Sequence, residues 1–178
     1  MSCPAHALAV SRRFLDWEDV DLIRELVASL PLGPHVHIVD LGAGSGTTAL
    51  SVFAARPHRV TLWTVDLDPI ALNWAEAAVT NIGRRRAWRP LCADSAAATA
   101  LYDLDRIDML LIDTSHEYEQ TVAELEAWLP LVRLGAPVWL HDYRGPYPGV
   151  KRAVDETVEA GLLRPHSTRG LGWGGWGT

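Results

Sequence analysis

The chain has 178 residues, of which 48% are hydrophobic and 21% charged, and its formal net charge is −6. This composition excludes a disordered or fibrous protein and is typical of a globular one, so we expect a single domain over residues 1–178. The negative charge argues against nucleic acid as a partner, because binding a phosphate backbone requires a basic surface.

Cysteine content and hydropathy exclude further classes of protein. Cys3 and Cys92 are too few and too far apart to indicate a disulfide framework or a zinc site, and Cys92, in an apolar run, is expected to be buried. The N-terminus lacks the charge order of a signal peptide, and no apolar run approaches the roughly 18 residues of a membrane span. We therefore expect a cytoplasmic protein that does not bind a membrane.

The first third of the chain contains two expected helices around one expected strand. Residues 1–15 have weak periodicity and are interpreted as a flexible arm or lid. Apolar residues then recur at helical spacing from Trp17 to Leu30, with Asp16 as the N-cap. An apolar strand is expected at Val36–Leu41, and a helix from Thr47 to Ala55.

The same two patterns alternate through the rest of the chain. Further strands are expected at Arg59–Asp66, Trp88–Ala93, Ile107–Ile112 and Pro137–Leu140. Further helices are expected from Pro69 through Val79 and at Ser95–Leu101, Glu117–Leu129 and Gly149–Ala160. The Gly- and Trp-rich residues 162–178 are interpreted as a pocket wall, an interface or a weak hairpin.

Apolar strands that alternate with helices indicate a parallel sheet with helices on both faces. Right-handed crossovers bring the carboxyl ends of such strands to one edge, where these folds bind ligands. Each expected strand ends at or next to an aspartate, and these are Asp40, Asp66, Asp94, Asp113 and Asp142. So many acids at one edge exceed the needs of the fold and indicate a ligand site.

A glycine-rich loop follows the first expected strand. Gly42, Gly44 and Gly46 occupy alternate positions after Asp40, so the backbone can turn tightly and a ligand can approach it closely. Their spacing departs from the dinucleotide pattern G-x-G-x-x-G, and the Gly-Lys-Ser/Thr of a phosphate-binding P-loop is missing.

Two further acids are interpreted as parts of a nucleoside site. Asp66 ends the second strand, where a carboxylate can accept hydrogen bonds from both ribose hydroxyls. Asp94, together with Ser95, can hydrogen-bond an adenine amino group. The alternative is that strand-end aspartates only cap the helices that follow, which explains Asp94 alone about equally well but the set poorly.

Asp113 and Asp142 end two strands that should be neighbours, roughly 5 Å apart. Two converging carboxylates suit Mg²⁺, which would lower the pKa of a bound hydroxyl. His141, which precedes the second acid, favours a softer ion than Mg²⁺. The alternative for Asp142 is a turn residue at the start of a loop.

His116 lies three residues after Asp113, just beyond the strand end. A histidine there can accept a hydroxyl proton, because its ordinary pKa is near working pH. The alternative is a helix-capping or structural histidine.

Several motifs together resemble one known family. The loop from Asp40 to Gly46 resembles the Asp-Leu-Gly-x-Gly-x-Gly loop of class I S-adenosylmethionine-dependent methyltransferases, and residues 111–119 resemble the "IDGxHxYE" signature of one methyltransferase group. Blocks at residues 128–130, 134–136, 141–143 and 148–156 continue the likeness. The chain resembles the group that includes macrolide-sugar and rhamnosyl O-methyltransferases and cephalosporin hydroxylase-like proteins, from about Asp16 to about Glu159.

This resemblance implies a Rossmann-like, mostly parallel sheet with a short antiparallel C-terminal hairpin in residues 162–178. It implies S-adenosylmethionine over the glycine loop, with Mg²⁺ as a candidate second cofactor. Metal ligands are implied at Asp113 and Asp142, where the residue before the second acid is often acidic but here is His141, and a general base is implied at His116, with Asp113 also catalytic. The predicted cofactor-binding residues are Asp40, Gly42, Ala43, Gly44, Gly46, Thr47, Asp66, Leu67, Asp94, Ser95 and Asp113.

The sequence therefore predicts O-methylation of a hydroxyl on a small molecule, such as a sugar or natural product, by direct displacement. One alternative is a non-catalytic protein that binds S-adenosylmethionine, since His141 replaces an acid and the chain is short. Another is a nicotinamide-dependent oxidoreductase, which the glycine spacing disfavours. The short, glycine-rich region of the last strands also predicts a sheet edge that is either abbreviated or covered by a partner chain, and a homo-oligomer is one way to cover it.

Overall fold

The computed structural model describes residues 15–31, 35–103, 106–165 and 173–175. Almost all of the predicted arm or lid and most of the predicted terminal hairpin lie outside these residues. Within the described residues, no helix is both long and apolar enough to cross a membrane. The predicted homo-oligomer stays a prediction.

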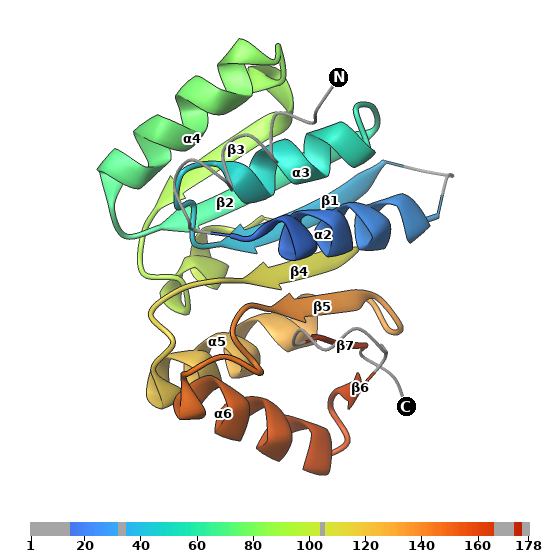
Figure 1. Cartoon of the computed structure of the whole chain (residues 1–178), viewed down its shortest axis with the longest axis vertical. Helices are drawn as coiled ribbons and strands as arrows, with labels where there is room; N and C mark the ends of the chain where they lie inside the picture. The colour runs from blue at the N-terminus through green and yellow to red at the C-terminus, as the bar shows by residue number, and fades with distance from the viewer. Residues whose placement is uncertain (1–14, 32–34, 104–105, 166–172, 176–178) are drawn as a thin grey trace.

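A single sheet runs through the molecule in the strand order β3-β2-β1-β4-β5-β7-β6 (Figure 1). The strands from β1 to β5 pair in parallel, and β7 pairs antiparallel with β5 and with β6. The predicted mostly parallel sheet is confirmed. The strands are β1 (Val36–Leu41), β2 (Val60–Asp66), β3 (Trp88–Cys92), β4 (Met109–Ile112), β5 (Pro137–Leu140), β6 (Arg164–Pro165) and β7 (Trp173–Gly175).

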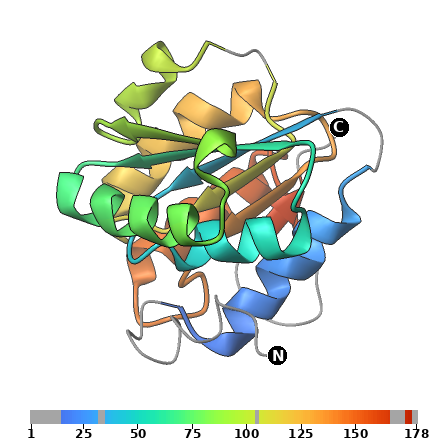
Figure 2. The same ribbon diagram turned by 90° about the horizontal axis from the view of Figure 1, so that it is seen from above.

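Helices cover both faces of this sheet, as predicted. Seen from above, α2, α3 and α4 lie on one side of the sheet and α5 on the other (Figure 2). Side chains of α6 pack with those of α5 in one hydrophobic core. The helices are α2 (Trp17–Ser29), α3 (Thr47–Ala55), α4 (Pro69–Asn81), α5 (Tyr118–Trp128) and α6 (Pro148–Glu159).

The two faces of β1 contribute to two separate hydrophobic cores. Val36 and Ile38 pack with α2, α3 and α4, whereas Val39 and Leu41 pack with α5 and α6. Because successive side chains of a strand point to opposite faces, an uninterrupted apolar strand is what a sheet buried on both faces requires. This explains the absence of polar alternation in the strands of this sequence.

Two predictions about the end of β3 and the residues that follow it were wrong. The helix expected at Ser95–Leu101 is a short 3₁₀ helix, η2 (Ala97–Leu101), which starts where the Asp94 carboxylate accepts the Ala97 N–H. Cys92 is exposed rather than buried. It ends β3, which is the terminal strand of the sheet, so one side of this strand has no neighbouring strand to cover it.

Backbone hydrogen bonds continue beyond the strand ends and hold the connecting loops together. Gly42 N–H donates to the Val65 carbonyl, Asp113 N–H to that of Leu41, and His141 N–H to that of Ile112, at 2.8 to 2.9 Å. The loops that follow β1, β4 and β5 therefore start at the same edge of the sheet.

Candidate active site

A cavity of about 620 Å³ opens at the carboxyl edge of the sheet, lined by loops from β1 to β5 and by the start of α5. Most predicted site residues line it, which confirms that the strand ends converge on one place. The predicted residues on its wall are Gly42, Gly44, Asp66, Leu67, Asp94, Ser95, Asp113, His116, His141 and Asp142.

The glycine loop needs its glycines for different reasons. Gly42 has a φ of 102°, and a Cβ added to it would lie 1.9 Å from the Asp113 carbonyl oxygen. Gly46, with a φ of 85°, would place a Cβ 2.9 Å from Ala75 Cα on α4. Gly44 has a φ of 48° and no heavy atom within 4 Å of an added Cβ. The outer two glycines allow close packing, and the middle one leaves open space on a residue that lines the cavity.

Asp66 is held by backbone amides at the end of β2. Its Oδ2 accepts the Ala43 N–H at 2.7 Å, and its Oδ1 accepts the Asp68 N–H at 2.8 Å. Two such bonds orient the carboxylate toward the cavity beside Leu67, whose side chain is 72% exposed. Ala43 thus contributes through its N–H to Asp66, and it is not on the wall.

Four predicted cofactor residues lie behind the wall of the cavity: Asp40, Ala43, Gly46 and Thr47. Asp40 is 1% exposed, and only its Oδ2 has a hydrogen-bond partner, the Thr64 hydroxyl at 3.4 Å. Burial, with the nearby Asp113 charge, raises the pKa of Asp40 well above its ordinary value. Its role as a contact to the cofactor stays a prediction.

At the other end of the cavity, four ionisable side chains meet. His116 Nε2 lies 3.1 Å from Asp113 Oδ1 and 3.3 Å from Asp142 Oδ2, and His141 Nδ1 lies 3.1 Å from the same two oxygens. We call Asp113, His116, His141 and Asp142 the acceptor-end cluster. Donor atoms of Asp113, His116 and His141 all lie within 4.8 Å of one another, a spacing that could hold a cation.

Unusual backbone geometry orients two members of this cluster. His116 has a φ of 61° and Asp142 a φ of 58°. Left-handed backbone is uncommon at residues other than glycine and persists where the surrounding structure holds it. The side chains of these two residues meet although they follow different strands.

Sequence reasoning missed Asp19 of α2, whose Oδ2 lies 3.3 Å from His141 Nε2. Asp19 is 2% exposed and also belongs to the capping box that begins α2. In the sequence it has the pattern of an ordinary helix-start acid, so no local signal points to the site. His141 is therefore in contact with three carboxylates, those of Asp19, Asp113 and Asp142.

The charges of this cluster depend on one another. Burial lowers the pKa of His141, but hydrogen bonds and charges of Asp113 and Asp19 outweigh it and raise this pKa to about 10. Burial raises the pKa of Asp113, yet hydrogen bonds from His116 and His141 bring it below its ordinary value. His141 is consequently an imidazolium at neutral pH, held beside the ionised Asp113 carboxylate.

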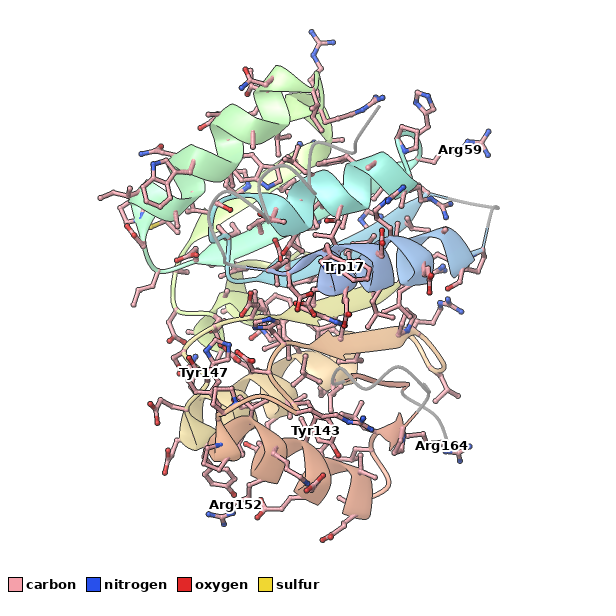
Figure 3. The ribbon with its side chains drawn as sticks, viewed as in Figure 1. Trp17, Arg59, Tyr143, Tyr147, Arg152 and Arg164 are labelled. Atoms are coloured by element: carbon pink, nitrogen blue, oxygen red, sulfur yellow. The ribbon has the colours of Figure 1, made fainter. Side chains whose placement is uncertain are left out.

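The loop after β5 contributes an aromatic wall. The Tyr147 ring stacks on the His116 ring, with centroids 4.5 Å apart and planes at 18°, and Tyr147 lines the cavity. Tyr143 lies elsewhere (Figure 3), and its hydroxyl donates to Asp155 of α6. Of the two tyrosines, only Tyr147 is part of the cavity.

Comparisons with known proteins agree with this geometry. A family model described as a methyltransferase domain matches residues 39–143, which is more than half of the chain. A search among curated proteins finds no match.

Solved structures show the same fold at low sequence identity. An S-adenosylmethionine-dependent O-methyltransferase from Thermotoga maritima is 12% identical, over 98% of this chain and 71% of that one, with a TM-score of 0.72. An O-methyltransferase from Bacillus cereus, solved with SAH, is 14% identical over 95% and 84%, with a TM-score of 0.70. A protein from Clostridium thermocellum assigned as an rRNA methylase is 14% identical over 80% of each chain, with a TM-score of 0.63. With its glycine loop, its signature and the match to the family model, the chain belongs to the methyltransferase domain family.

Proposed function

We propose that this protein transfers the methyl group of S-adenosylmethionine to a hydroxyl of a small molecule. The observation that carries the proposal is one cavity with two unlike ends, the glycine loop with Asp66 at one and the acceptor-end cluster at the other. Membership of the methyltransferase family supports the reaction class, and similar structures named as O-methyltransferases support oxygen as the acceptor atom.

The cofactor end suits a nucleoside with a charged tail. The Asp66 carboxylate would accept hydrogen bonds from the ribose hydroxyls, as an acid at the end of the second strand does in related folds. Leu67 would contact the adenine ring with its exposed apolar side chain. The open side of Gly44 would let the ligand approach the backbone without meeting a side chain.

The acceptor end suits removal of a hydroxyl proton. His116 Nε2 faces two carboxylate oxygens, so the neutral ring places its hydrogen on Nε2 and keeps a lone pair on Nδ1. A hydroxyl that reaches Nδ1 would give up its proton there as its oxygen bonds to the methyl carbon, and the bond between that carbon and sulfur would break to leave S-adenosylhomocysteine. Asp113 would orient the ring and stabilise the imidazolium that forms, in the role that a carboxylate has beside other catalytic histidines.

His141 is unsuited to the role of base. Its imidazole already carries a proton and is surrounded by Asp19, Asp113 and Asp142. We assign it a charge-balancing role, in which its positive charge helps to keep the Asp113 carboxylate ionised beside His116.

Mg²⁺ fits this donor set poorly. Asp113 and Asp142 alone would suit it, but His141 Nδ1 lies 3.1 Å from both, and imidazole nitrogen favours transition metals over Mg²⁺. No step of the proposed mechanism therefore requires Mg²⁺. A cation at Asp113, His141 and Asp142 would lower the pKa of the hydroxyl, and it would first have to displace the His141 proton.

Calorimetric titration with S-adenosylhomocysteine tests the proposed function. We expect binding at one site per chain, followed by methyl transfer when a panel of hydroxyl compounds is supplied with S-adenosylmethionine, with or without Mg²⁺. Lack of binding by the intact protein would overturn the proposal.

A non-catalytic protein that binds S-adenosylmethionine is the second candidate. The observation in its favour is that carboxylates and imidazoles of the cluster neutralise one another, which leaves few groups for a substrate. Binding of the cofactor without turnover on any member of the panel would favour it over the enzyme.

A further inference from the structure

A buried carboxylate lies behind the cofactor end of the cavity. Glu124 of α5 is 0% exposed, although glutamate is rarely buried without partners. Ser95 Oγ donates to its Oε1, and Thr114 Oγ1 donates to its Oε2 at 3.0 Å. Ser95 follows β3 and Thr114 follows β4, so Glu124 connects two loops of the cavity wall.

Gln120, one helical turn before Glu124, completes this network. Its Nε2 donates to Ser95 Oγ at 2.8 Å and to Glu124 Oε1 at 3.2 Å. The Ser95 hydroxyl hydrogen goes to Glu124, so Ser95 Oγ can only accept from Gln120. Both amide hydrogens of Gln120 are therefore used, and both neighbours are acceptors.

The orientation of the Gln120 amide follows from this count of donors and acceptors. A flipped amide would place its oxygen against the Glu124 carboxylate and the Ser95 oxygen, and two oxygen–oxygen contacts would replace two hydrogen bonds. The nitrogen must point inward, which leaves Oε1 as the free end of a side chain that lines the cavity. Within the described residues, no hydrogen-bond donor is recorded for this oxygen.

A second acceptor lies at the same end of the cavity. Asp94 precedes Ser95, lines the cavity and uses its Oδ1 to accept the Ala97 N–H, so its other carboxylate oxygen is available. Two acceptor groups, the Asp94 carboxylate and Gln120 Oε1, suit a ligand group that has two hydrogens to donate. The exocyclic amine of an adenine ring is such a group.

We propose that Gln120 is a specificity-determining residue that accepts a hydrogen bond from the adenine amine together with Asp94, and that Glu124 is the positioning residue that sets its amide. The inference rests on the proposed function, because it assumes that a nucleoside cofactor occupies this end of the cavity. It predicts that the site rejects a purine with an oxygen in place of the amine, since two acceptors would then face a third.

The experiment compares binding of S-adenosylhomocysteine with that of S-inosylhomocysteine, in which a carbonyl oxygen replaces the amine and the adjacent ring nitrogen N1 carries a hydrogen. We expect the wild-type protein to prefer the adenosyl compound about 100-fold or more, because two hydrogen bonds from the amine are replaced by contacts between acceptor oxygens in the inosyl complex. Gln120→Leu should reduce this preference about tenfold, chiefly by weakening the adenosyl compound. Glu124→Gln should reduce it too, since a second amide beside Gln120 permits the flipped orientation.

Control measurements separate this inference from loss of folding. Glu119→Gln changes the exposed neighbour of Gln120 on α5 and should leave the preference unchanged. Gln120 is only partly buried, so its leucine variant remains informative if Glu124→Gln does not fold. A Gln120→Leu protein that binds both compounds more weakly by the same factor, or with the wild-type preference, would overturn the inference. Failure of the wild-type protein to bind either compound would instead overturn the proposed function.

Discussion

The two ends of the cavity are built from different interactions. At the cofactor end, acids bond to backbone amides, as Asp66 does with the N–H groups of Ala43 and Asp68. At the acceptor end, ionisable side chains form ion pairs with one another, and nitrogens of His116 and His141 lie close to the same oxygens of Asp113 and Asp142. The first arrangement depends on backbone shape and the second on a balance of charges.

This difference determines how each end should respond to mutation. Removing an acid that accepts from backbone amides leaves neutral N–H groups, which water in an open cavity can satisfy. Removing one member of the acceptor-end cluster leaves charges without partners, at a higher cost. Mutations at the cofactor end should therefore act on binding or on local packing, and mutations at the acceptor end on turnover.

The sharpest test of this comparison is His116→Ala. We expect turnover to fall by about 10²- to 10⁴-fold, because a general base contributes about that much, while affinity for S-adenosylhomocysteine stays within about threefold. The measurements are turnover on an accepted hydroxyl compound and calorimetric titration. Tyr118→Phe is the control, since the Tyr118 hydroxyl bonds to Glu156 outside the cavity. Wild-type turnover in the alanine variant would remove His116 from the mechanism.

The backbone packing of the cofactor end is tested by Gly42→Ala against Gly44→Ala. Gly42→Ala should lower the free energy of unfolding by about 3 kcal/mol, because its Cβ would meet the Asp113 carbonyl at a left-handed backbone position. Gly44→Ala should cost only about 1 kcal/mol, since just the backbone conformation opposes it. Denaturant unfolding measures both values. Equal losses would contradict the packing role assigned to Gly42.

Asp66→Ala should remove a contact to the cofactor and leave the proposed base, His116, intact. Affinity for S-adenosylhomocysteine should fall about 10- to 100-fold, the effect of removing hydrogen bonds to a charged group. The matched control is Asp68→Ala, which removes the N-cap of α4 and should cost about 1 kcal/mol of stability without changing affinity. If both variants bind the ligand as the wild type does, Asp66 makes no contact with the ribose.

The smallest expected effect concerns Asp40, which lies beneath both ends. Its folded-state pKa is raised by burial, so the folded protein holds this proton more tightly than the unfolded chain and loses stability as pH rises above about 4. An asparagine at this position has no proton to lose in this pH range. At pH 8 the free energy of unfolding of Asp40→Asn should therefore exceed that of the wild type by about 1 kcal/mol. The difference should be smaller at pH 5. A difference in unfolding free energy that does not change with pH would contradict a buried, titrating Asp40.

Much of the fold could be predicted because its signals are local. The strand that precedes Gly42 is mostly apolar, and the cap at Asp16 marks the start of α2. Pro69 and Asp68 likewise mark the start of α4. Each signal lies within a few residues of the structure it specifies. The 3₁₀ helix after Asp94 was missed because composition favours a helix there without setting its type.

The contacts within the site were harder to predict because they join distant parts of the chain. Asp19 is more than 100 positions from its partner His141, and Glu124 is 29 positions from Ser95. Nothing in the local pattern distinguishes Asp19 from a capping residue or Glu124 from a solvated helix residue. Both carboxylates are buried in the folded protein, and a buried carboxylate requires polar partners from the residues that the fold brings near it. These partners place Asp19 and Glu124 in the site.

The sequence alone determined the parallel sheet, the edge where its acids gather and the likeness to methyltransferases, because strand periodicity, turn glycines and helix caps act over short distances. The tertiary structure decided which acids reach the cavity, that His141 is held as a cation among three carboxylates, and that the Gln120 amide nitrogen points toward Ser95 and Glu124. These depend on side chains that meet across loops and layers, where distance and burial set the charge and the direction of each group.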